Sequence, residues 1–158
     1  MLDLSRLIAA GCALWMTTGE ARAEFRDYVL DPAHTSIGFM VHHIGYADTL
    51  GLFREVEGRF AYDEAAPAVR DVYVEVPAAS VFSNNEARDE HARGADFLDA
   101  GDHPLIVFEG KEATPTGQRA GTITGDLTLR GVTREVTFDL ELNKAGPYPF
   151  DPTGGGEP

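Results

Sequence analysis

The chain has 158 residues with 13 basic and 26 acidic side chains, which gives a formal net charge of −13 at pH 7. This acidic balance disfavours nucleic acid and anionic membrane surfaces as partners, because both are polyanions. Cys12 is the only cysteine, so an intramolecular disulfide is excluded and folding must rest on the apolar core.

Residues 1–23 have the form of a secretory signal peptide. Arg6 precedes an apolar stretch from Leu7 to Thr18, and Ala21-Arg22-Ala23 supplies a small-x-small cleavage site. We therefore predict cleavage between Ala23 and Glu24, export, and a periplasmic location for the mature chain. A membrane anchor is the alternative, but the stretch is shorter than the ~20 apolar residues of a spanning helix. Lipidation at Cys12 is a further alternative, although apolar residues continue past it.

Residues 24–144 are predicted to form one mainly β domain, because apolar side chains recur at every second position. Such alternation is typical of antiparallel strands with one buried and one wet face. Six or seven strands are expected, which indicates a barrel or a sandwich. The alternating segments are Ile37/Phe39/Val41, Val56/Phe60/Tyr62, Val72/Val74/Val76, Ile106/Phe108, Ile123/Leu127/Leu129 and Val136/Phe138/Leu140/Leu142.

One helix and two irregular regions complete the expected organisation. Ser83-Asn84-Asn85-Glu86 has the pattern of a capping box, in which Glu86 reaches back to the Ser83 backbone. Asp89 and Arg93 stand four residues apart as an ion pair on a solvated helix face, and Gly94 ends the helix. Arg130-Gly131 is predicted to form a tight hairpin turn. Residues 145–158, rich in proline and glycine, read as a loop.

Catalytic and metal-binding patterns are weak in this sequence. The five histidines form no His-x-His or His-x-x-x-His pair, and no cysteine cluster exists, so no metal site is predicted. An enzyme hypothesis would use Asp89 and His91 as an acid–base pair in a hydrolase-like reaction, but residues two apart on a helix do not face each other. No phosphate-binding loop or dinucleotide motif is present, and we expect no cofactor.

Several motifs, taken together and in order, resemble the YceI-like family. They run from Tyr28 to about Leu142, nearly all of the predicted mature chain. The motifs are Tyr28-Val29-Leu30-Asp31-Pro32-x-His34-Thr35, Gly51-Leu52-Phe53, Gly58-x-Phe60, Ser83-Asn84-Asn85-x-x-Arg88-Asp89-x-His91-x-Arg93, Asp96-Phe97-Leu98-Asp99, His103-Pro104-x-Ile106-x-Phe108 and Gly125-x-Leu127-Thr128-Leu129-x-Gly131-Val132-Thr133.

The resemblance implies a lipocalin-like antiparallel barrel with one short inserted helix, and an exported protein that binds polyisoprenoids or other long-chain amphiphiles. It implies no catalytic residues. Family members continue with closing strands for which this sequence has no residues, so we predict an open barrel. Its unpaired edge near Phe138 to Leu142 is predicted to favour aggregation and homodimers.

The leading hypothesis is a binding protein, not an enzyme, that holds a long apolar molecule such as a polyisoprenoid, quinone-like or fatty acyl chain. No nucleic acid partner and no stable membrane insertion are expected. A second hypothesis is an interaction or stress-response protein that docks on a membrane redox system through its acidic surface. The predicted ligand-binding residues are Ile37, Phe39, Val41, Phe60, Val74, Phe97, Phe108, Leu127, Leu129, Phe138 and Leu140.

Overall fold

The computed structural model describes residues 23–146, so the predicted cleavage site lies at its start, while Cys12 and the final twelve residues lie outside it. Ala23 and Glu24 are exposed and belong to no strand. The elements are β1 Arg26–Val29, β2 Ile37–His43, β3 Ala47–Phe53, β4 Glu57–Asp63, β5 Ala68–Pro77, the 3-10 turn η1 Ala78–Ser80, β6 Val81–Phe82, α1 Glu86–Arg93, β7 Leu105–Pro115, β8 Ala120–Leu129 and β9 Val132–Glu141.

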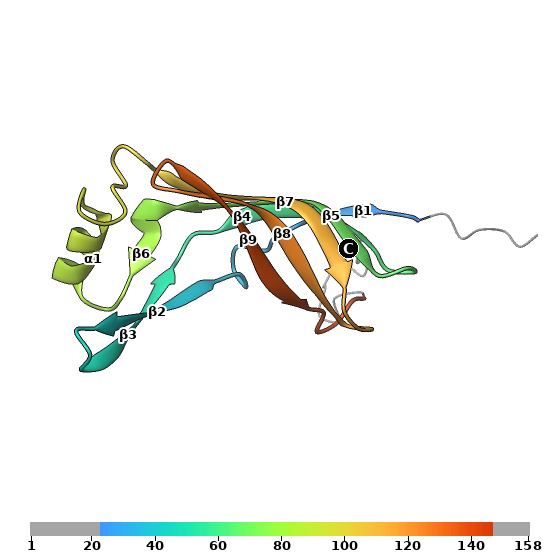
Figure 1. The fold of residues 1–158 in the computed structure, drawn as a ribbon, viewed down its shortest axis with the longest axis horizontal. Helices are drawn as coiled ribbons and strands as arrows, with labels where there is room; N and C mark the ends of the chain where they lie inside the picture. The colour runs from blue at the N-terminus through green and yellow to red at the C-terminus, as the bar shows by residue number, and fades with distance from the viewer. Residues whose placement is uncertain (1–22, 147–158) are drawn as a thin grey trace, which may run out of the picture.

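Six antiparallel strands form one curved sheet in the order β1-β4-β5-β7-β8-β9 (Figure 1). Register shifts interrupt the ladders between Arg59 and Ala61 and between Gly110 and Glu112. Such bulges increase twist and bend a sheet, which accounts for its arched shape. The predicted turn between β8 and β9 is present, with φ of 49° at Arg130 and 69° at Gly131.

A second sheet of β2, β3 and β6 lies under one end of the arch. β2 and β3 form a long hairpin, and β6 pairs with β3 through Leu52 opposite Phe82. Helix α1 follows β6 at the same end of the molecule as the hairpin tip (Figure 1). α1 has eight residues. No helix in the described part of the chain is long and apolar enough to cross a bilayer.

The mainly β, antiparallel fold predicted from alternation is confirmed, with nine strands instead of six or seven. β1 and β6 are too short to show a period, and β3 carries Asp48 and Thr49 where an apolar repeat would begin. The expected alternation is partly present in β4, where Phe60 and Tyr62 lie on one face, since both rings pack against Tyr28. Val56 lies before the strand, and beyond the bulge the most buried side chains are Ala61 and Asp63.

The predicted capping box is wrong, although the helix itself is present. The N-cap residue is Asn85, whose side-chain oxygen accepts the backbone N–H of Arg88 at 3.0 Å. The Ser83 backbone N–H donates to Asp89, not to Glu86. Both Ser and Asn are good capping residues, and the sequence could not show that the chain turns into the helix two residues later than Ser83.

The predicted Asp89–Arg93 ion pair is also wrong. Arg93 donates to Glu86 at 2.9 Å, whereas Asp89 points into the protein and is only 3% exposed. The other acidic residues of α1 are exposed, as expected for a solvated face. Gly94 ends the helix, as predicted, with its N–H bonded to the His91 carbonyl.

The sheets do not close into a barrel, which confirms the predicted open form. β9 is an edge strand that pairs only with β8 among residues 23–146. Phe138 and Leu140, on this edge strand, are 45% and 36% exposed.

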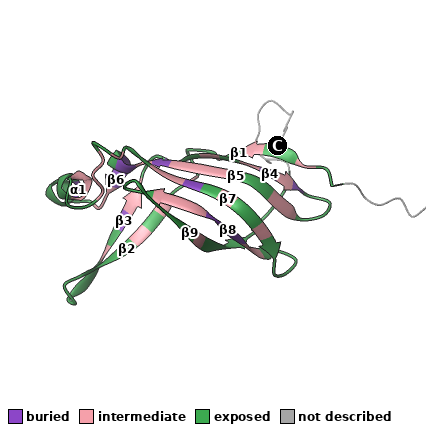
Figure 2. Cartoon of the chain, turned by 45° about the horizontal axis from the view of Figure 1, so that its top comes forward, coloured by how far each residue is buried: buried purple, intermediate pink, exposed green. Residues whose placement is uncertain are grey.

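Few large side chains are fully buried, and Figure 2 shows buried positions scattered along the strands. Among large side chains of the described residues, Asp63 is the one below 2% exposure. The buried apolar residues are Val56, Ala61, Val76, Ala78, Val81, Phe108 and Ile123. Apolar side chains therefore line the interior but do not fill it completely.

Asp63 closes the turn between β4 and β5. Its carboxylate accepts backbone N–H groups from Ala66, Glu24 and Ala65, and these bonds, chiefly that from Ala66, lower the pKa of Asp63. A carboxyl whose pKa is lowered by folding stabilises the protein above its unfolded pKa of about 3.9. That stabilisation is lost as the pH falls through the lower folded pKa.

We predict that Asp63→Ala lowers the thermal unfolding midpoint at pH 7, and that the difference from wild type shrinks below about pH 4. Calorimetry at pH 7 and pH 3 measures both. The exposed Asp139 on β9 provides the control, since Asp139→Ala should leave the midpoint close to wild type at pH 7. An equal deficit for Asp63→Ala at both pH values would contradict this role.

Candidate ligand-binding cavity

A cavity of about 700 Å³ lies between the concave face of the six-stranded sheet and the β2–β3 hairpin. Every side chain that lines it is aliphatic or aromatic, and none is titratable. The lining residues are Ile37, Phe39, Val41, Phe53, Val72, Val74, Val76, Val81, Ala92, Phe97, Leu98, Ile106, Phe108, Ile123, Leu127, Leu129, Phe138 and Leu140. Its size falls in the usual range for small-molecule sites, roughly 300–1,000 Å³.

Part of the lining is exposed to solvent. Phe97 is 55% exposed and Val41 51%, although both contribute to the wall. Leaving so much apolar surface in water is unfavourable by about 25 cal/mol per Å². An apolar molecule that covered these side chains would remove that cost, so the cavity is suited chemically to an apolar ligand.

The structure brings ten of the eleven predicted ligand-binding residues together in this cavity. The exception is Phe60, which lines a neighbouring hollow and stacks on Tyr28 at 5.4 Å between ring centroids. Phe60 lies opposite the bulge in β5, where Asp71 and Val72 face this single residue of β4. Whether any of the eleven contacts a ligand stays a prediction.

Several lining residues were missed by the sequence analysis. Val72, Val76, Ile106 and Ile123 belong to the recognised alternating segments and could have been included on that signal. Others have no periodic signal, because they enter from the second sheet and from the region around α1. These are Phe53, Val81, Ala92 and Leu98.

The neighbouring hollow, of about 320 Å³, extends the apolar surface along the sheet. Val72, Ile123 and Leu140 line both spaces, so the two are adjacent. Along β7 the lining runs from Ile106 in the cavity to Pro115 in the hollow. At about 3.3 Å per residue that is roughly 30 Å of strand. The shape is an elongated trough.

Helix α1 and the loop after it form the end wall of the cavity through Ala92, Phe97 and Leu98. Loop hydrogen bonds hold this wall, since the Leu98 N–H donates to the Ala92 carbonyl at 3.0 Å. The Phe97 ring meets the His91 ring edge-on at 4.8 Å between centroids.

Ser83 anchors α1 to the end of β6. Asp89 accepts both the backbone N–H of Ser83, at 2.8 Å, and its hydroxyl. Arg88 donates to the Ser83 hydroxyl at 2.7 Å and to its carbonyl at 2.6 Å. The buried Asp89 carboxylate thus holds the helix through one oxygen, Oδ1, and the position of the cavity wall depends on these bonds.

The outer face of the sheet is polar, in contrast to the cavity. Thr124 and Thr137 are joined across β8 and β9 by a hydroxyl hydrogen bond of 2.8 Å. Lys111 lies 2.6 Å from Asp126 and 3.3 Å from Glu135, and its pKa is raised, mainly by the hydrogen bond to Asp126. Such cross-strand pairs stabilise the curved sheet.

The residues of the enzyme hypothesis do not form a pair. Asp89 is buried against Ser83, whereas His91 is exposed and its ring nitrogen lies 4.0 Å from Asp96. No group of three or more His, Cys, Asp or Glu side chains with metal-binding geometry occurs within residues 23–146.

Comparison with known proteins identifies the family. The YceI-like domain model matches residues 28–156. The chain belongs to the YceI-like family. This is a family of binding proteins.

Relatives of this YceI-like chain include UPF0312 proteins of Azotobacter vinelandii and Vibrio cholerae, 39% and 40% identical. Each alignment covers 94% of this chain, and respectively 75% and 78% of the relative. The Campylobacter jejuni YceI crystal structure superimposes with a TM-score of 0.64 at 30% identity, covering 77% of this chain and 71% of that one. Burkholderia cenocepacia BcnA, at 21% identity, shares the fold with a TM-score of 0.63 over 77% of this chain and 70% of its own.

We predict that Asp89→Ala loosens the end wall of the cavity without unfolding the sheet. The Ser83 N–H loses its acceptor in a buried site, which costs about 1–3 kcal/mol. Hydrogen exchange followed by mass spectrometry should show faster exchange in residues 83–103 and little change in β7 and β8. Ser83→Ala, which keeps the backbone bond to Asp89, should have a smaller effect. Unchanged exchange in Asp89→Ala would contradict the anchoring role.

Proposed function

We propose that this YceI-like protein binds a long apolar or amphipathic molecule, such as a polyisoprenoid, quinone-like or fatty acyl chain, in the trough under its curved sheet. The observation that carries the proposal is the cavity of about 700 Å³ whose lining is apolar throughout. A ligand with many polar groups would lose its hydrogen bonds to water there without gaining partners.

The shape of the trough supports a long ligand over a compact one. The cavity and the hollow together extend along β7 from Ile106 to Pro115, roughly 30 Å. Polar side chains line only the hollow, and they include Gln118, Arg119, Thr122 and Glu141. An extended hydrocarbon chain with one polar group fits this arrangement, because the chain can lie along the sheet while the polar group reaches solvent.

The proposal includes export. The apolar stretch from Leu7 to Thr18 followed by Ala21-Arg22-Ala23 supports secretion and a periplasmic location. Protein sequencing of the mature chain from cells should begin at Glu24. A mature chain that retains residues 1–23 would contradict this part of the proposal.

Binding can be tested with two neighbouring positions on β9 that face opposite sides of the sheet. Phe138 lines the cavity and meets Phe108 edge-on at 5.1 Å between ring centroids, while Asp139 is exposed on the outer face. We predict that Phe138→Gln weakens binding of a fluorescent fatty acid about tenfold or more, because it places a polar amide in the apolar wall. Asp139→Gln should bind like wild type.

Circular dichroism and unfolding midpoints of both variants separate loss of binding from loss of fold. A second cavity variant, Leu129→Gln, covers the case in which Phe138→Gln is unstable. The natural ligand can be sought by native mass spectrometry and organic extraction of purified protein. Equal affinities of wild type and both cavity variants, or no uptake of any apolar molecule, would overturn the proposed function.

A further inference from the structure

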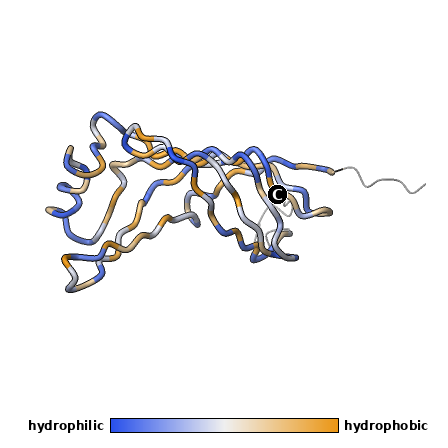
Figure 3. Tube along the Cα trace, in the orientation of Figure 1, coloured by the Kyte–Doolittle hydropathy of each residue, from blue (hydrophilic) through white to orange (hydrophobic). Residues whose placement is uncertain are grey.

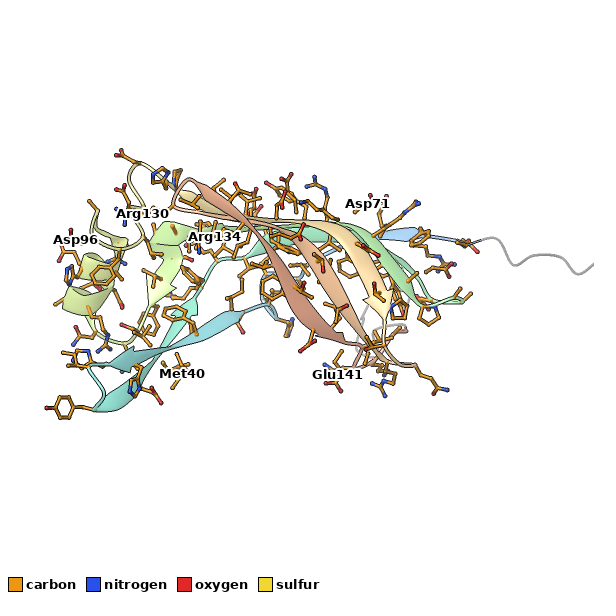
Figure 4. All side chains as sticks on the ribbon, viewed as in Figure 1. Met40, Asp71, Asp96, Arg130, Arg134 and Glu141 are labelled. Atoms are coloured by element: carbon orange, nitrogen blue, oxygen red, sulfur yellow. The ribbon has the colours of Figure 1, made fainter. Side chains whose placement is uncertain are left out.

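The β2–β3 hairpin carries apolar side chains on both faces. Phe39 and Val41 face the cavity. On the opposite face Met40 and Leu50 stand directly across from each other and are 60% and 59% exposed. Figure 4 shows Met40 on the side of the hairpin turned away from the six-stranded sheet. The outer positions of β9 carry threonine and acidic residues instead, so this hairpin departs from the pattern of the molecule.

The hairpin tip adds two more exposed apolar side chains. Ile44 is 77% exposed and Tyr46 is 89% exposed. The turn between them is closed by a hydrogen bond from the Tyr46 N–H to the His43 carbonyl at 2.9 Å. Ile44 has φ of 52°, a left-handed conformation that is costly for a β-branched residue. Figure 3 shows hydrophobic colour at this tip.

The β2–β3 hairpin carries much less negative charge than the rest of the chain. Residues 37–53 contain one acidic residue, Asp48, and no lysine or arginine. The Asp48 carboxylate lies 2.7 Å from the ring of His42. In a protein with a net charge of −13, this hairpin is therefore a segment that can approach a lipid surface with little electrostatic repulsion.

The exposed area is small for a protein interface. At roughly 200 Å² for a bulky side chain, the exposed parts of Met40, Ile44, Tyr46 and Leu50 amount to about 600 Å², against roughly 800 Å² for each partner of a stable complex. A lipid surface needs no matching shape, and tyrosine is favoured at the boundary between lipid headgroups and hydrocarbon.

We propose that the tip of the β2–β3 hairpin docks reversibly on a zwitterionic phospholipid bilayer. The inserted side chains are Met40, Ile44, Tyr46 and Leu50. Docking sets the cavity beside the membrane, because Ile37, Phe39 and Val41 of the same hairpin line that cavity. An apolar molecule can then pass between bilayer and trough without crossing open water. This last step rests on the proposed function, whereas the docking itself does not.

The test is co-sedimentation of the chain beginning at Glu24 with phosphatidylcholine vesicles. This form retains every described strand and lacks the apolar stretch from Leu7 to Thr18, which would bind lipid by itself. We expect wild type to associate and the double variant Ile44→Asn/Tyr46→Ser to lose about tenfold or more in partition coefficient. Asparagine tolerates the left-handed backbone at position 44, so the fold should be retained.

Val29→Asn is the matched control. Val29 is an apolar residue, 81% exposed, on the edge strand β1 of the other sheet, and its replacement should leave vesicle association unchanged. No association by wild type, or equal loss in Val29→Asn, would overturn the proposal. So would a fall from dimer to monomer in the hairpin variant by sedimentation velocity, since the tip would then be a contact between two copies.

A local probe tests the orientation independently. The chain from Glu24 has no cysteine, so Tyr46→Cys and Val29→Cys each carry a single environment-sensitive fluorophore. Vesicles should shift the emission to the blue at position 46 and leave position 29 unchanged, and the reverse result would overturn the proposal. Fatty acid binding measured without vesicles is a separate readout, which should be equal in wild type and Ile44→Asn/Tyr46→Ser. Failure of wild type there counts against the proposed function and not against docking.

Discussion

The structure depends on one physical constraint. The concave face of its curved antiparallel sheet is apolar, and the protein's own side chains cover this face only in part. Alternation places Val74, Phe108 and Leu127 on that face, and bulges in the β4–β5 and β7–β8 ladders bend it into a trough. In most small domains such a face is covered by packed side chains at nearly crystalline density. Here the second sheet covers only part of it, and a cavity of about 700 Å³ remains.

Polar interactions are placed where they maintain this shape and are kept out of the cavity. Threonine pairs and the Lys111 cluster hold the outer face of the sheet. Asp63 stabilises the turn between β4 and β5, and Asp89 holds the helix that closes one end of the cavity, each by accepting backbone N–H groups. This is the arrangement that allows a buried acidic group without a cationic partner. The most buried charged residues therefore serve architecture, and the surface offered to a ligand is uniformly apolar.

Over the described part of this YceI-like chain the sheets do not close into a barrel, which is consistent with the partly covered concave face. Among residues 23–146 of this YceI-like chain, β9 is an edge strand, and its Phe138 and Leu140 line the cavity while remaining partly exposed. The β2–β3 hairpin lines the same cavity through Ile37, Phe39 and Val41 and carries the exposed apolar side chains Ile44 and Tyr46 at its tip. Ligand access and contact with a lipid surface would thus involve one side of the molecule.

The sequence by itself determined the antiparallel β class, the inward faces of most strands, the position of the helix and, through its motifs, the family. Period-two alternation is local information, so Phe39, Phe108 and Leu127 could be placed on an inward face from their neighbours alone. Only the tertiary structure decided that Phe60 lies opposite a bulge and lines the neighbouring hollow, that Asn85 and not Ser83 caps the helix, and that Asp89 is buried. It also decided that Phe53, Ala92 and Leu98 complete the cavity. Those outcomes depend on register and on contacts between segments distant in sequence, which no local pattern records.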